Sequence, residues 1–208
     1  MNKKDITRAF QAISATMAQN VDILTELDAK FGDGDLGVSM KSGFAVVSEY
    51  ALSNTEVDLG ILLKGCSIAL NKAAPSTLGT ILSFGLMGMA KSLKGLEEAD
   101  LSKLSKAMRA GLELIMERGN AKPGDKTVLD SLFPAVETLA KHADRNADEA
   151  FSFAYQAAQS GAEATKGMTG KHGRVAYFGD KTLGETDSGA MAGCLIFKAL
   201  AECARSEG

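Results

Sequence analysis

The chain has 208 residues and a hydrophobic share of 45%, which supplies enough apolar material for a substantial core. Its net charge of −3 and the lack of a lysine- or arginine-rich run argue against nucleic acid and anionic membranes as partners. No apolar stretch approaches a transmembrane length, and three cysteines without CxxC spacing indicate buried thiols in a reducing cytoplasm.

Apolar residues recur at helical spacing along nearly the whole chain. The first stripe runs from Ile6 to Leu27 and leads on directly from the N-terminus, so we expect no signal peptide. Asp58, Asp100 or Ser102, and Asp148 are candidate N-caps of later helices. The later stripes run over Met40–Ala51, Leu62–Leu70, Leu78–Leu93, Leu104–Ile115, Leu129–Leu139, Phe151–Ala162 and Met191–Leu200.

These stripes predict an all-α fold of about eight helices. Short loops between long helices indicate antiparallel neighbours in an up-down bundle. We find no internal repeat and no linker, so we expect a single domain over residues 1–208. The exception is a glycine-rich segment at 166–189, which we expect to be an ordered lid or binding loop. A weak strand signal lies within it, at Arg174–Phe178.

An acidic, glycine-rich turn at 27–37 follows the first stripe. Asp28 lies in the last helical turn, and Asp33 and Asp35 follow in the loop, so three carboxylates meet at a negative helix end. A hard cation with oxygen ligands would relieve their repulsion. A solvated Asx turn is the simpler alternative for this stretch alone.

Two familiar motifs do not fit this turn. Gly32, Gly34 and Gly37 match GxGxxG, but a helix precedes them where the dinucleotide fingerprint needs a buried strand. An EF-hand loop counted from Asp33 would place Phe44 at its twelfth position, where a bidentate Glu is required.

Further loops carry groups suited to phosphate. Ser76 and Thr77, the Gly124–Thr127 loop and Asp187–Gly189 each open a predicted helix, and Arg174 could neutralise phosphate as a forked donor. Each is an ordinary helix cap when taken singly. In an up-down bundle, however, alternate loops share one end, so we expect these loops to meet the acidic turn there.

Three blocks of this sequence resemble the L subunit of dihydroxyacetone kinase, its nucleotide-binding component. The resemblance covers essentially the whole chain. The blocks are Leu27–Phe44 with its acidic turn, Arg118–Glu137 with Pro123-Gly124-Asp125-Lys126-Thr127, and Gly173–Ala190 with Arg174, Tyr177, Gly179 and Asp187-Ser188-Gly189.

The resemblance implies an eight-helix, barrel-like bundle with a nucleotide, ADP or ATP, on one rim. It implies that Asp28, Asp33 and Asp35 bind Mg²⁺, usually two ions, and that Arg174 is the candidate catalytic residue. The implied nucleotide-binding positions are Gly37, Val38, Ser39, Ser76, Thr77, Gly119, Val128, Arg174, Asp187, Ser188 and Gly189.

The implied activity is phosphoryl transfer to dihydroxyacetone, or to a related ketose, held on a separate K-type subunit. The phosphoryl donor is either ATP or a phosphotransferase-system protein that recharges bound ADP, and a homodimer is left open. This chain departs from the family pattern at Leu36, where His is common, at Ser39, where Asn is common, and at Ser188, where Pro is common. The loop at 74–77 also differs.

Two other functions remain open at this stage. A non-catalytic module could bind Mg-nucleotide and regulate a partner protein without transferring phosphate. A helical bundle could also hold a lipid or another apolar ligand in its centre, for which the small residues and nine methionines leave room.

Overall fold

The computed structural model describes residues 1–205, which form helices joined by short loops. Within these residues there is no β-strand, and an isolated β-bridge joins Asn2 and Glu98. The weak strand signal at 174–178 was wrong, because this stretch belongs to a 3-10 helix. The elements are α1 (Lys3–Gln19), α2 (Val21–Ala29), α3 (Leu36–Ser53), α4 (Leu59–Ala73), α5 (Thr77–Ser92), α6 (Leu101–Gly119), α7 (Leu129–Lys141), α8 (Ala147–Ala164), η1 (Thr165–Gly167), η2 (Arg174–Thr182) and α9 (Ser188–Arg205).

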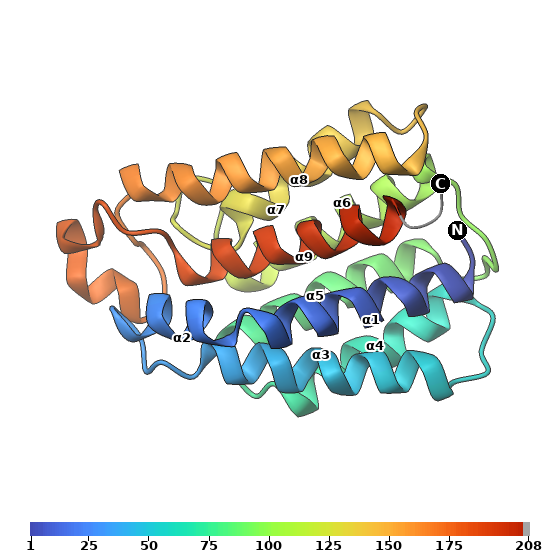
Figure 1. The fold of residues 1–208 in the computed structure, drawn as a ribbon, viewed down its shortest axis with the longest axis horizontal. Coiled ribbons are helices and arrows are strands. Elements are labelled where there is room, and N and C mark those ends of the chain that lie inside the picture. The colour runs from blue at the N-terminus through green and yellow to red at the C-terminus, as the bar shows by residue number, and fades with distance from the viewer. Residues whose placement is uncertain (206–208) are drawn as a thin grey trace.

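The helices form a closed ring. Each helix from α3 to α9 packs against the next one in sequence, and α9 returns to pack against α1 (Figure 1). The first predicted stripe is broken at Asn20 into α1 and α2, which both pack against α3. Counting α1 and α2 as one column, the described residues contain eight columns. The predicted bundle of about eight helices is therefore confirmed.

Side-chain caps start most of these helices. Asp58 accepts a hydrogen bond from the Ile61 amide at 3.0 Å, and Asp100 accepts one from the Lys103 amide at 2.7 Å. The cap predicted at Asp148 was wrong. Asn146 begins α8 instead, because its side chain reaches the amide three residues further on, at 2.9 Å.

Glycines bring neighbouring helices together. Gly88 on α5 faces α6 so closely that a Cβ atom there would lie 2.5 Å from the carbonyl oxygen of Ala110. Inside the ring, an apolar cavity of about 140 Å³ is lined by side chains that include Phe10, Phe44 and Leu112. The ring therefore surrounds a small internal space at its centre.

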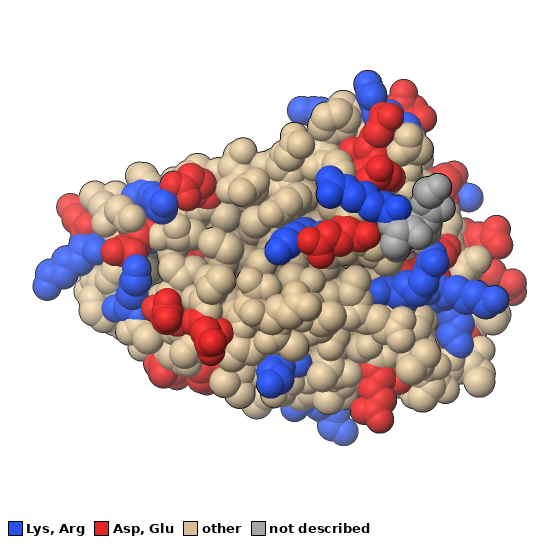
Figure 2. Space-filling model, in the orientation of Figure 1, with Lys and Arg blue, Asp and Glu red and all other residues tan. Residues whose placement is uncertain are grey.

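The surface agrees with the charge balance of the sequence. On the face in Figure 2, lysine and arginine lie beside aspartate and glutamate rather than in one extended block of either sign. Among the described residues, no helix has both the length and the apolar character needed to cross a membrane.

We expect Gly88→Ala to lower the free energy of unfolding by about 1–3 kcal/mol, because the added methyl group would force α5 away from α6. Chemical denaturation followed by circular dichroism measures this change. Gly167→Ala is the matched control, since a Cβ atom there meets nothing within 4 Å. Equal stability of the two variants would contradict the close packing of α5 on α6.

Candidate functional site

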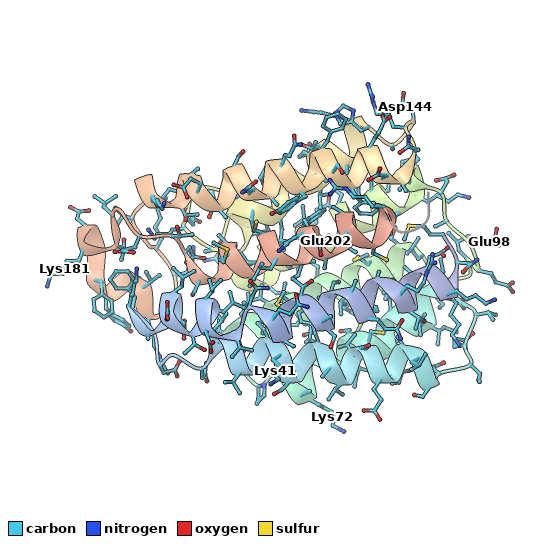
Figure 3. The ribbon with its side chains drawn as sticks, in the orientation of Figure 1. Lys41, Lys72, Glu98, Asp144, Lys181 and Glu202 are labelled. Carbon is cyan, nitrogen blue, oxygen red and sulfur yellow. The ribbon has the colours of Figure 1, made fainter. Side chains whose placement is uncertain are left out.

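Four helices begin at the same end of the bundle, because direction alternates around the ring. The loops that precede α3, α5, α7 and α9 meet there, beside η2, at the left in Figure 1. In Figure 3, Lys181 of η2 lies at this end, and Glu98 and Asp144 lie toward the other. The loops enclose a cleft of about 440 Å³. The predicted meeting of these loops is confirmed.

Three carboxylates converge at the edge of this cleft. Asp28, in the last turn of α2, and Asp33 and Asp35, in the following loop, each offer an oxygen within 4.8 Å of the others. Asp28 is fixed from two sides. It accepts a hydrogen bond from the Gly34 amide at 2.9 Å and another from the Ser188 hydroxyl at 3.3 Å.

Asp33 and Asp35 of this cluster lie in different electrostatic surroundings, which shift their pKa values in opposite directions. A hydrogen bond from Arg174 lowers the pKa of Asp33. Partial burial, followed by the charges of Asp33 and Asp28, raises the pKa of Asp35. Three hard oxygen donors at this spacing, with mutual repulsion that a cation would relieve, fit Mg²⁺.

Helix N-termini supply positive potential around the same cleft. The Ser76 hydroxyl caps α5 by accepting from the Gly79 amide at 3.1 Å, and Asp187 caps α9 by accepting from the Ala190 amide at 2.8 Å. The first turn of α3 has no side-chain cap, whereas in α7 the Leu129 amide donates to the Thr127 hydroxyl at 3.2 Å. Because the positive end of a helix dipole favours anions, this part of the cleft suits phosphate groups.

Most of the predicted site residues line the cleft. They are Asp28, Asp33, Asp35, Ser76, Thr77, Gly119, Val128, Arg174, Asp187, Ser188 and Gly189. Three others, all in the first turn of α3, are not among the lining residues: Gly37 is buried, Val38 is exposed, and the Ser39 hydroxyl donates to that of Ser76 at 3.0 Å. Gly37 packs so tightly that a Cβ atom would lie 2.2 Å from the carbonyl oxygen of Val21.

The segment predicted to be a lid or binding loop folds over the acidic turn. Arg174 forms an ion pair with Asp33. Phe178 packs against Phe31 with 5.2 Å between the ring centroids, and Glu185 pairs with Lys30. The cationic end of Arg174 is therefore held at the proposed metal ligands.

Asp125 joins this segment to the loop before α7. Its carboxylate accepts from the Lys122 amide at 2.9 Å, lies 2.8 Å from the Lys171 ammonium, and lies 3.1 Å from Nε2 of His172. The hydrogen bond from Lys171 is the largest of the effects that hold the pKa of Asp125 far below its usual range. The sequence alone does not indicate this contact of His172, because its partner lies 47 positions away.

Two further ionisable groups in the cleft, those of Asp187 and Lys126, are at least half-buried, which the sequence does not indicate. Burial raises the pKa of Asp187 to about 6. Lys126, next to Asp125, is 1% exposed and has a left-handed backbone with φ of 61°. A loop lysine is normally expected in solvent, and no local sequence signal marks this one as buried.

We expect Asp125→Asn to lower the free energy of unfolding by about 1–2 kcal/mol near pH 7, because it removes the charge that Lys171 and the Lys122 amide contact. The folded-state pKa of Asp125 is depressed, so its contribution is present above about pH 4 and is lost as pH falls below that. Urea titrations from pH 7 to pH 2 measure the difference. A difference that grows on acidification would contradict this ion-pair arrangement.

Comparison with known proteins agrees with this geometry. Residues 30–202 match the family model described as the DAK2 domain. The chain is 30% identical to the PEP-dependent dihydroxyacetone kinase ADP-binding subunit DhaL of Escherichia coli, across 88% of this chain and 89% of that protein. It is also 30% identical to the L-erythrulose 1-kinase of Mycolicibacterium smegmatis, across 96% of this chain but 35% of that protein.

A solved structure shares the fold. The dihydroxyacetone kinase of C. freundii, in complex with AMP-PNP and Mg²⁺, superposes with a TM-score of 0.75 at 27% identity. The match covers 94% of this chain and 33% of that one. The chain therefore belongs to the DAK2 domain family, and among its relatives it resembles in length the DhaL-type ADP-binding subunits of dihydroxyacetone kinases.

Proposed function

We propose that residues 1–208 act as a single domain that binds Mg-nucleotide and serves as one subunit of a cytoplasmic dihydroxyacetone kinase-type phosphotransferase. The observation that carries this proposal is the meeting of Asp28, Asp33 and Asp35 with four helix N-termini in one cleft. That arrangement offers ligands for a cation and donors for phosphate side by side.

Each group has a distinct role in this proposal. The three aspartates hold Mg²⁺, in one or two ions, which would neutralise the nucleotide phosphates. Amides at the starts of α5, α7 and α9 donate hydrogen bonds to phosphate oxygens, and Arg174 steadies the transferred phosphoryl group. Positioning and charge neutralisation are the main requirements of phosphoryl transfer, so this half of the site needs no nucleophile of its own.

In this proposal, partner proteins supply both the acceptor and the donor of the phosphoryl group. The E. coli relative is named as an ADP-binding subunit, which supports a separate K-type subunit that holds the acceptor. Relatives named as dihydroxyacetone and L-erythrulose kinases support a small ketose as the acceptor class. The E. coli relative is also PEP-dependent, which favours a phosphotransferase-system protein over free ATP as the donor.

The metal site is tested with two variants. We expect Asp33→Ala and Asp35→Asn to abolish measurable binding of Mg-ADP in calorimetric titration, because each removes a ligand and leaves the phosphates facing uncompensated carboxylates. Asp22→Asn is the matched control, since it removes an exposed carboxylate from the far end of α2. Native mass spectrometry of the wild type should find ADP and magnesium together.

Failure of this proposal has a clear signature. Wild-type protein that carries no nucleotide, and binds none in the presence of Mg²⁺, would exclude the nucleotide-binding role. Nucleotide binding without phosphotransfer to any K-type partner would instead favour the regulatory module.

The role of Arg174 is tested separately. We expect Arg174→Ala to weaken binding of Mg-AMP-PNP by about tenfold to a hundredfold, because a charge-assisted donor to the terminal phosphate is lost. Arg145→Ala, which removes an exposed arginine paired with Glu149, should leave the affinity unchanged. Unaltered affinity and turnover in Arg174→Ala would remove this residue from the site.

A further inference from the structure

Lys126 has an unusual set of partners for a lysine. Its side chain is among the largest that are fully buried, and its ammonium group, which has three N–H donors, lies within hydrogen-bond distance of four backbone carbonyl oxygens. The distances to these acceptors are 2.9 Å to Thr165, 3.1 Å to Met168, 2.7 Å to Thr182 and 2.7 Å to Glu185. This ammonium group is therefore surrounded by main chain.

The four carbonyl groups belong to the two stems of one loop. Thr165 and Met168 lie on the chain that leaves α8, and Thr182 and Glu185 lie on the chain that returns to α9. We call the residues between these stems, 169–181, the lid. The stems are also joined directly, by a bond of 2.8 Å from the Gly184 amide to the carbonyl of Lys166. Lys126 thus closes the base of the lid.

The charged form of Lys126 suits this position. Burial lowers the pKa of its ammonium group, whereas the carboxylates of Asp187, Glu185 and Asp130 act in the opposite direction. A buried cation is tolerated only where acceptors and nearby negative charge replace water. Four carbonyl dipoles and three acidic neighbours supply that environment here.

We propose that Lys126 is a positioning residue that clamps the two stems together and so holds Arg174 of the lid against the acidic turn. The inference rests on the proposed function only for the consequence that it assigns to Arg174. Without the ammonium group, four carbonyl oxygens at the base lose their donor, and water must enter to satisfy them. The stems then separate, and Arg174 loses its fixed place beside Asp33.

Hydrogen exchange tests the clamp directly. In Lys126→Met, residues 169–185 should exchange at least about tenfold faster than in the wild type, because the lid opens more often. The matched control is Lys198→Met, which removes a lysine of α9 paired with Glu202, outside both stems, and should leave exchange unchanged. Unaltered exchange in Lys126→Met would overturn the inference.

A double-mutant cycle tests whether Lys126 acts through Arg174. We expect Lys126→Met to weaken Mg-AMP-PNP binding about as much as Arg174→Ala, and the double variant to bind no more weakly than either single one. A purely structural effect of Lys126 would multiply with that of Arg174→Ala. Multiplicative losses in the double variant would therefore overturn the positioning role.

One result separates this inference from the proposed function. If the wild type binds no nucleotide, the proposed function fails, but hydrogen exchange still decides whether Lys126 holds the lid.

If Lys126→Met does not fold, Lys126→Gly replaces it, because glycine adopts the φ of 61° at this position without strain. Added n-butylammonium should then restore slow exchange of the lid, and n-butanol should not. Equal effects of the amine and the alcohol would overturn the role of the charge.

Discussion

The site depends on one consequence of up-down topology, which is that every second helix starts at the same rim. Four helix dipoles therefore point their positive ends at one cleft, while the last turn of α2 and the loop after it bring three aspartates there. The positive helix ends do not fully offset the negative charge of the aspartates, because the three carboxylates also repel one another. A ligand that carries both a divalent cation and phosphate groups meets both requirements, and this connects the fold to the proposed chemistry.

The departures from the family pattern make contacts with one another or with the site. Ser188, where Pro is common in the family, donates its hydroxyl to Asp28 and so helps to fix a proposed metal ligand. Ser39, where Asn is common, bonds to Ser76 at the start of α5. Leu36, where His is common, is buried at the start of α3. The Ser188 and Ser39 hydroxyls thus connect elements of the rim, and Leu36 is part of the core.

Local patterns were enough to predict the helices and the acidic turn. Apolar spacing and capping residues act within a few positions of the chain, as with Asp58 and Asp100, and the aspartates of the turn are also close in sequence. The break at Asn20 could not be predicted, because apolar spacing continues across it. The burial of Lys126 could not be predicted from the sequence either. Its acceptors lie 39 to 59 positions away, and they are carbonyl groups, which every residue has.

Closure of the ring by α9 against α1 also determines where the chain enters and leaves. Met1 and the end of α9 lie together at the end of the bundle opposite η2 (Figure 1). The 18 residues of α9 separate its exit from the cleft by about 27 Å. The rim with the lid and the aspartates therefore lies at the end of the bundle opposite Met1 and the last described turn of α9.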